Sequence, residues 1–298
     1  MLVNPLRRRR NLLLLVLLTP ALAWLLVIYI GSLTNLLHYS LYSYDEVQEK
    51  ILTEIGFISL AKIFTQPNLE VILRTLGMAA AVTVFSVVIA FPLASYIARH
   101  ARGWLRFLVF FAVMMPLWSS YLVKLYVWKM LLAKDGVISY LAAHLGLGHA
   151  LEKLLTLPVV GGNSLSYSTL GRFLVFLYMW LPYMILPMAA SLERIPSSLF
   201  ESATDLGATG WQKFRTIVLP LAMPGIAAGS IFTFSLTLGD YIIPQVIGDS
   251  SPFIGLVIYQ AQGNGADLPF AAAFTLVPIV ILCVYLMIVR RMGAFDAL

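Results

Sequence analysis

The stretch that decides the fold reads PSSLFESATDLGATGWQKFRTIVLP and occupies residues 196–220, between two strongly apolar runs. Pro196 is compatible with a helix start, and Ser198-x-x-Glu201 has the spacing of a capping box. Apolar side chains then recur on one face of the predicted helix. Gly207 is expected to end this helix in the left-handed conformation.

A second helix is predicted directly after this turn. Thr209-x-x-Gln212 has the spacing of another capping box, and aromatic and apolar residues follow it. The whole stretch therefore predicts an amphipathic helix–turn–helix. Such a hairpin serves either as a docking surface for a partner protein or as a plain surface hairpin beside the membrane, and the pattern alone leaves both interpretations open.

The composition around this hairpin is that of a membrane protein. Of the 298 residues, 60% are hydrophobic and only 11% are charged, whereas soluble domains carry about 25% charged residues. Most of the surface must therefore face lipid. The net charge of +6 is interpreted as a topology signal rather than as a sign of nucleic-acid binding.

A helix needs roughly 20 mostly apolar residues to cross a bilayer, and six apolar runs are long enough. They cover residues 12–33, 71–97, 104–132, 169–192, 219–247 and 270–289. The third run is over-long and carries Lys124 and Lys129 near its far end. A span to about Leu122, followed by an interfacial helix with snorkelling lysines, is the interpretation that explains it.

The first run imitates a secretory signal peptide. Arg7–Arg10 would be its basic region, Leu12–Leu18 its apolar region, and Ala21-Leu22-Ala23 its cleavage site. The apolar run continues, however, through Trp24–Ile30 and so reaches full bilayer length. We therefore expect a retained transmembrane helix.

Basic residues near the span ends predict the orientation. With the N-terminus in the cytoplasm, the cytoplasmic side receives Arg7–Arg10, Arg99, Arg102, Arg106, Arg194, Lys213, Arg215, Arg290 and Arg291. The last external loop, 248–269, has no Lys or Arg. The predicted fold is therefore an all-α, multi-pass membrane protein with six transmembrane helices and both termini in the cytoplasm.

The hairpin also carries a family resemblance. Glu201-Ser202-Ala203, then Gly207, then Ile217-x-Leu219-Pro220 resembles the EAA–x3–G–x9–I–x–LP signature of ABC importer permeases. Ser202 stands where the family usually has alanine. The resemblance extends from roughly Leu69 to Arg291, and it implies the architecture of a type I ABC importer permease in a bacterial inner membrane.

In that family the hairpin couples transport to a cytoplasmic ATPase dimer. The resemblance implies that Glu201, Ala203, Asp205 and Gly207 are docking and turn residues. The chain has no G-x-x-x-x-G-K-[ST] phosphate loop. ATP and Mg²⁺ are therefore expected on a separate ATPase subunit, and no cofactor and no catalytic residue is expected in this chain.

Three segments are predicted on this basis. Residues 1–68 form an N-terminal transmembrane helix and an external loop. Residues 69–291 form the permease core, with the coupling loop at about 192–220. Residues 292–298 form a short cytoplasmic tail.

Asp240 is the only acid well inside a predicted span, and an ionisable group at such depth is a functional-site candidate. It either attracts a cation on the transport pathway or is a structural, hydrogen-bonded residue at a helix break beside Gly239 and Pro244. The rings of Tyr241, Trp180 and Tyr183 are candidates to line such a pathway and bind a cation through cation–π interactions. Packing or interfacial anchoring is the alternative role of these aromatic residues.

The run Thr237-Leu238-Gly239-Asp240-Tyr241 resembles spermidine/putrescine-type permeases, particularly the first of their two paired subunits. This resemblance implies a heterodimer with a sister permease and an external binding protein, periplasmic or lipid-anchored, that delivers a polyamine. Wider relatives carry other solutes, including aminoethylphosphonate and ferric iron, so the cargo stays open.

Other classes of function find little support in the sequence. The four histidines form no ligand cluster with Cys283, and neither H-E-x-x-H nor G-x-S-x-G occurs. No metal site is therefore expected. A secondary carrier or channel is the alternative from a different class, although the chain shows no clear internal repeat of the kind many carriers have.

Overall fold

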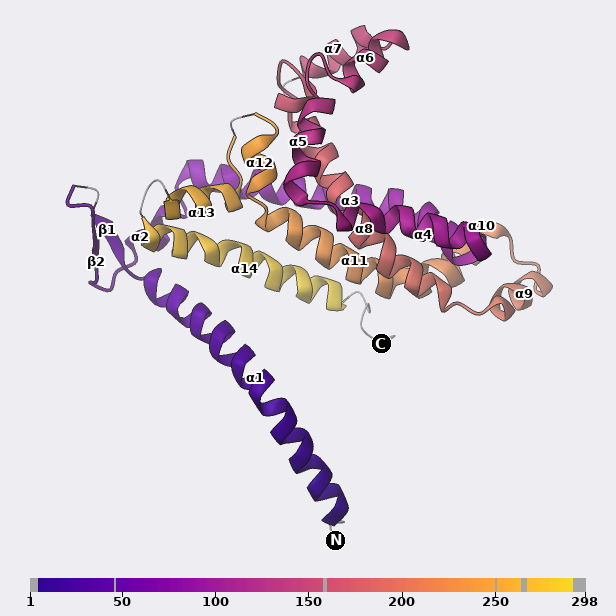
Figure 1. Cartoon of the computed structure of the whole chain (residues 1–298), viewed down its shortest axis with the longest axis horizontal. Helices are drawn as coiled ribbons and strands as arrows, with labels where there is room; N and C mark the ends of the chain where they lie inside the picture. The colour runs from indigo at the N-terminus through magenta and orange to yellow at the C-terminus, as the bar shows by residue number, and fades with distance from the viewer. Residues whose placement is uncertain (1–4, 46, 158–159, 250, 264–266, 292–298) are drawn as a thin grey trace. The chain divides into compact units, whose positions relative to one another are not determined.

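The computed structural model describes residues 5–45, 47–157, 160–249, 251–263 and 267–291 (Figure 1). The chain divides into two compact units. Unit 1 comprises residues 1–65 and 260–276, and unit 2 comprises residues 66–259 and 277–298. The predicted tail, residues 292–298, lies outside the described residues.

Unit 1 contains the N-terminal helix and a small hairpin. Helix α1 runs from Pro5 to Tyr39. Strands β1 (Ser43–Asp45) and β2 (Lys50–Leu52) pair antiparallel, with Tyr44 opposite Ile51. Helix α2 (Ile58–Lys62) follows. The segment expected as an external loop is therefore partly regular structure.

Two polar contacts hold unit 1 together after the hairpin. The Ser59 hydroxyl donates to the Tyr42 carbonyl at 2.7 Å. The Lys62 ammonium pairs with the Asp267 carboxylate at 3.1 Å. Asp267 directly precedes α14 (Leu268–Arg291), which begins in unit 1 and continues into unit 2.

The core of unit 2 is built from three long helices: α3 (Gln66–Arg99), α8 (Thr169–Glu193) and α11 (Leu219–Gly239). Helix α8 packs against both others along much of its length. Gly225 and Gly229 of α11 allow this approach. A Cβ at Gly225 would lie 2.5 Å from the Pro187 carbonyl of α8. Small residues at such contacts are the usual means of close helix packing in membranes.

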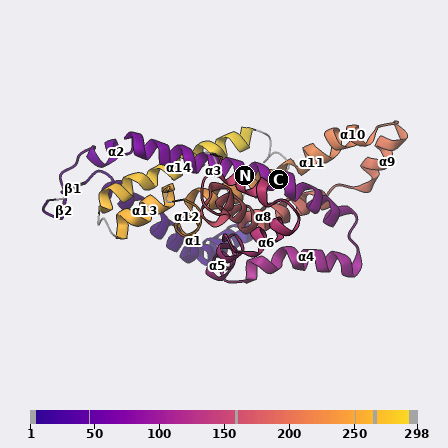
Figure 2. The same cartoon turned by 90° about the horizontal axis from the view of Figure 1, so that it is seen from above.

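Shorter helices complete unit 2, and the last of them, α13, continues into unit 1. In chain order they are α4 (Gly103–Trp118), α5 (Tyr121–Leu131), α6 (Val137–His144), α7 (Gly148–Leu155), the 3₁₀ turn η1 (Leu165–Tyr167), α9 (Ser197–Asp205), α10 (Gly210–Lys213), the π-helical turn η2 (Phe214–Val218), α12 (Ile242–Val246) and α13 (Ile254–Gly263). Figure 2 shows α9 and α10 at one end of α11, and α12 lies at the other.

The spans agree with the sequence in number but not in every boundary. Five described helices are long and apolar enough to cross a membrane, and α4 with α5 makes a sixth, bent by 98°. The predicted helix end near Leu122 is wrong, because α4 already ends at Trp118. The end of a helix leaves backbone carbonyls without partners in the helix. The Lys124 ammonium donates to one of them, the Pro116 carbonyl, at 2.6 Å. Lys124 therefore caps the end of α4 across the break.

The fifth predicted span is also interrupted. Helix α11 ends at Gly239, and Asp240 has an extended backbone, with φ −72° and ψ 131°. The chain then forms the separate five-residue helix α12. The fifth apolar run, 219–247, thus forms two helices with Asp240 at the joint, and the helix break considered beside Gly239 and Pro244 is present.

Candidate functional sites at the two ends of α11

The hairpin before α11 has the two-helix form expected from the sequence. Helix α9 ends at Asp205, and Gly207 has φ +74°, the left-handed conformation that glycine adopts most readily. The second capping box is confirmed. The Thr209 hydroxyl accepts from the Gln212 backbone N–H at 3.3 Å, and the Gln212 side chain accepts from the Thr209 N–H at 2.7 Å.

The first capping box is wrong. Pro196 occupies the position before α9, no side-chain cap is present there, and Ser198 lies inside the helix. Pro196 has φ −65° and ψ 143°, so its backbone alone starts the helix. Ser198 and Glu201 therefore do not share the reciprocal bonds that their spacing suggested.

The hairpin exposes apolar surface next to acidic side chains. Leu206 is 87% exposed and Trp211 is 69% exposed, at either side of the Gly207 turn. Glu201 and Asp205 are exposed on α9, while Ala203 is half-buried. Large apolar side chains with this exposure beside charges are typical of a protein–protein contact. The four predicted coupling residues, Glu201, Ala203, Asp205 and Gly207, thus all lie on α9 and the turn that follows it.

One contact holds the two helices of this hairpin together, and another joins the hairpin to α3. The Lys213 ammonium donates to the Thr204 hydroxyl at 2.7 Å, which joins the second helix to the first. The Arg99 guanidinium at the end of α3 lies over the Phe200 ring, 4.0 Å from its centroid. The hairpin therefore contacts α3 and is continuous, through η2, with α11.

A cavity of about 380 Å³ lies at the other end of α11. Its lining residues come from α5, α8 and the α11–α12 joint, and they are Tyr121, Trp180, Ser235, Leu236, Gly239, Asp240, Tyr241 and Ile242. The cavity is mostly apolar and has one carboxylate. Its volume falls in the usual range for small-molecule sites.

The Asp240 carboxylate is held by three donors. Its Oδ1 accepts from the backbone N–H groups of Ile242 at 2.8 Å and Ile243 at 3.0 Å, so it caps the start of α12. Its Oδ2 accepts from the Tyr121 hydroxyl. The sequence offered a structural role at a helix break and a pathway charge as alternatives. In the structure the same half-buried carboxylate both caps α12 at the break and lines the cavity.

The structure brings together three of the four predicted pathway residues, namely Asp240, Tyr241 and Trp180. Tyr183 does not line the cavity, and its ring instead packs edge-on against Trp180 with 5.9 Å between centroids. Trp180 is buried, and no described group accepts a hydrogen bond from its indole Nε1. The Trp180 indole Nε1 is therefore a buried donor without a described acceptor beside the cavity.

Tyr121 was missed by the sequence interpretation. It is the first residue of α5, and its ring also stacks on Trp180 with 6.2 Å between centroids. The only local signal was its place after Ser119-Ser120, where the third apolar run breaks. Among the described residues no group of three or more His, Cys, Asp and Glu side chains is placed to hold a metal ion.

Comparisons with known proteins agree with this arrangement. Residues 86–295 match the family model described as "Binding-protein-dependent transport system inner membrane component". The chain is 54% identical over 285 residues to the inner membrane ABC transporter permease protein YdcU of Escherichia coli K12, covering 96% of this chain and 91% of that protein. It is 28% identical over 232 residues to the spermidine/putrescine transport system permease protein PotB of Salmonella typhimurium SL1344, covering 78% and 77%.

The fold also resembles that of a solved importer. A chain of a bacterial ABC transporter involved in the import of the acidic polysaccharide alginate superposes with a TM-score of 0.72 at 20% identity, covering 97% of this chain and 98% of the other. At that identity the likeness concerns the fold alone.

Proposed function

Because the chain belongs to the binding-protein-dependent transport family of inner membrane components and is a permease subunit of an ABC importer, we propose that its cargo is a polyamine such as spermidine or putrescine. Membership in this family removes a secondary carrier or channel from the alternatives. The PotB relatives, at 28% identity, support a polyamine, whereas the printed name of the more similar YdcU specifies no solute.

The observation that carries this proposal is the single carboxylate of Asp240 in an otherwise apolar cavity. An ammonium group that enters the cavity gains a carboxylate partner away from bulk water, where the attraction is stronger than at an exposed site. The rings of Tyr121 and Trp180 line the same cavity and offer cation–π faces. An anionic cargo would be repelled by the negative charge of Asp240.

In the proposed assembly the chain pairs with a sister permease, and an external binding protein delivers the polyamine. A cytoplasmic ATPase dimer binds the hairpin through Glu201, Ala203 and Asp205, with Gly207 forming its turn. The exposed Leu206 and Trp211 support such a contact. ATP and Mg²⁺ act on the ATPase, and this subunit contributes the pathway and the coupling surface without a catalytic group.

The test is uptake by cells that depend on the complete transporter. Radiolabelled spermidine and putrescine are offered separately, and each is then challenged with an excess of aminoethylphosphonate or ferric iron. We expect saturable polyamine uptake that neither competitor reduces. Inhibition by aminoethylphosphonate or ferric iron, or no polyamine uptake at all, would assign the permease to another solute.

A further inference from the structure

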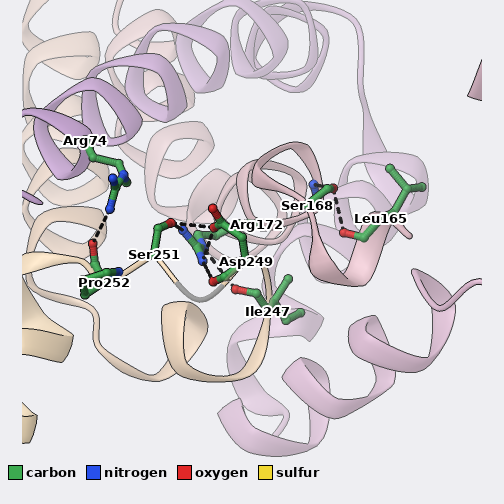
Figure 3. Close-up of polar contacts among 9 residues, drawn as sticks. Arg74, Leu165, Ser168, Arg172, Ile247, Asp249, Ser251 and Pro252 are labelled. Carbon is green, nitrogen blue, oxygen red and sulfur yellow. Dashed lines mark hydrogen bonds and ion pairs between the residues drawn. The ribbon is translucent and has the colours of Figure 1, made fainter. Parts of the chain in front are cut away.

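Arg172 of α8 is a charged side chain with no solvent exposure. A guanidinium is costly to bury unless its N–H groups find acceptors. Arg172 lies in the first turn of α8, outside the cavity. Its partners belong to the segment that follows α12, as Figure 3 shows.

The Arg172 guanidinium donates several hydrogen bonds to that segment. Nε donates to the Ile247 carbonyl at 3.0 Å, and Nη2 donates to the Asp249 carbonyl at 2.7 Å. Nη1 donates to the Ser251 hydroxyl at 3.3 Å. Nη2 also pairs with the Asp249 carboxylate at 3.0 Å, and the Phe253 ring lies 4.6 Å from the guanidinium carbon. Arg172 thus recognises the shape of a backbone turn and not only a countercharge.

Gly248 lets the backbone come this close. It has φ +98°, and a Cβ there would overlap Nε and Nη2 of Arg172. Its N–H donates to the Ser166 carbonyl at 2.8 Å, which fixes the turn from its other side. Any side chain at residue 248 would therefore strain the backbone and push the guanidinium away.

Helix α3 holds the chain just beyond this turn. The Arg74 guanidinium donates to the Pro252 carbonyl at 3.3 Å (Figure 3), and the Thr75 hydroxyl accepts from the Ile254 N–H at 3.1 Å. The segment after α12 is therefore attached to two core helices, and Arg172 supplies most of the described side-chain bonds.

Helix α12 lies between the residues that Arg172 contacts and the cavity. It has five residues, with Asp240 capping its start and Ile247 directly after its end. A helix this short spans only about 7 Å, so a shift at Ile247 moves the Asp240 end as well. We propose that Arg172 is the positioning residue that holds α12, and through it the Asp240 carboxylate, at the wall of the cavity.

A lysine cannot perform this role. Its three donors radiate from one nitrogen, whereas the Arg172 contacts use three separate nitrogens of a planar fork. If only the charge beside Asp249 mattered, Arg172→Lys would suffice. The Asp249 side chain is 47% exposed, so its ion pair contributes less than the buried carbonyl contacts.

The experiment follows the position of α12 by chemical labelling, which needs no knowledge of the cargo. Ile243 is buried on α12 and is changed to cysteine in a Cys283→Ser background of the full chain in detergent, so that labelling requires α12 to move. The maleimide labelling rate is compared among Arg172→Gln, Arg172→Lys, Gly248→Ala and Asp249→Asn variants. Ser197→Cys on α9 is the control position.

We expect Arg172→Gln, Arg172→Lys and Gly248→Ala to raise labelling at residue 243 about tenfold, as the loss of buried bonds to a charged group allows. Asp249→Asn is expected to change it less than about twofold. Labelling at residue 197 should stay constant. Wild-type labelling in the Arg172→Gln and Gly248→Ala variants, or restoration by Arg172→Lys, would overturn the proposal.

Uptake then tests the link to the cavity, and this step rests on the proposed polyamine cargo. With spermidine as the probe, Gly248→Ala should raise the half-saturating concentration about tenfold, with a smaller change in maximal rate. Faster labelling with unchanged half-saturation would overturn the role at the cavity. Absence of spermidine uptake by the unaltered transporter would instead reject the cargo and leave the labelling result standing.

Discussion

At its N-terminal end α11 continues from a hairpin that exposes Leu206 and Trp211, whereas at its C-terminal end the chain half-buries the Asp240 carboxylate in an apolar cavity. The hairpin is shaped by bonds between residues at most nine apart, as in the Thr209 capping box and the Lys213–Thr204 bond. The cavity depends on contacts between residues more than a hundred positions apart, as between Tyr121 and Asp240. One end therefore has a shape encoded locally, and the other has a shape that exists only in the folded core.

This difference suggests that the two ends of α11 have separate roles. The internal bonds of the hairpin join residues that are close in sequence, so most of its shape does not depend on the core. A site assembled from α5, α8 and the α11–α12 joint instead changes whenever those elements shift. The following predictions test whether the two ends are separable in this way.

Gly207→Asp is expected to have the largest effect. Residue 207 has φ +74° with nothing within 4 Å, so the change strains the turn and adds a charge to the proposed docking surface without a clash. Uptake should fall more than about tenfold while membrane insertion stays normal. Uptake and membrane level are measured together.

The matched control is Gly210→Ala, at a glycine of the same hairpin that has no positive φ and no neighbour within 4 Å. It should transport normally. Wild-type uptake by the Gly207→Asp variant would remove the hairpin from the coupling mechanism.

Asp240→Asn tests the cavity end. Asparagine can still accept the bonds from Ile242 and Ile243, so α12 keeps its cap while the negative charge is lost. The half-saturating spermidine concentration should rise about tenfold. Asp135→Asn, at an exposed acid between α5 and α6, is the control and should have no effect. Unchanged kinetics in the Asp240→Asn variant would leave the carboxylate with its capping role alone.

Tyr121→Phe should have a smaller effect of opposite sign. The Tyr121 hydroxyl occupies Asp240 Oδ2, so its removal frees that oxygen for an ammonium group. The half-saturating concentration should fall about threefold, equivalent to one ordinary hydrogen bond. Uptake measured over a range of spermidine concentrations checks this. An increase would mean that the hydroxyl positions the carboxylate more than it competes for it.

Thr209→Ala should have the smallest effect on uptake. It removes one cap of α10, which costs about 1 kcal/mol of local stability. Amide exchange of residues 211–213 should quicken about fivefold, while uptake falls less than about twofold. Thr216→Ala, whose hydroxyl only bonds back to the Gln212 carbonyl, is the control. A large loss of uptake would show that the hairpin depends on this single bond.

The sequence determined the membrane class, the number of spans and the hairpin. Apolar runs of bilayer length and the positive φ at Gly207 follow from local composition, because both depend on residues close together in the chain. The Asp240 cavity was only partly predictable. Asp240 stood out as an acid in an apolar run, but nothing in the sequence joined it to Tyr121.

The tertiary structure decided the rest. The 98° bend between α4 and α5 and the break after Gly239 turn two apparently continuous runs into the walls of one cavity. The burial of Arg172 against the segment after α12 was likewise absent from any local pattern. Hydropathy reports which residues avoid water, whereas donors and acceptors far apart in the chain find each other only once the core has brought them within hydrogen-bond distance.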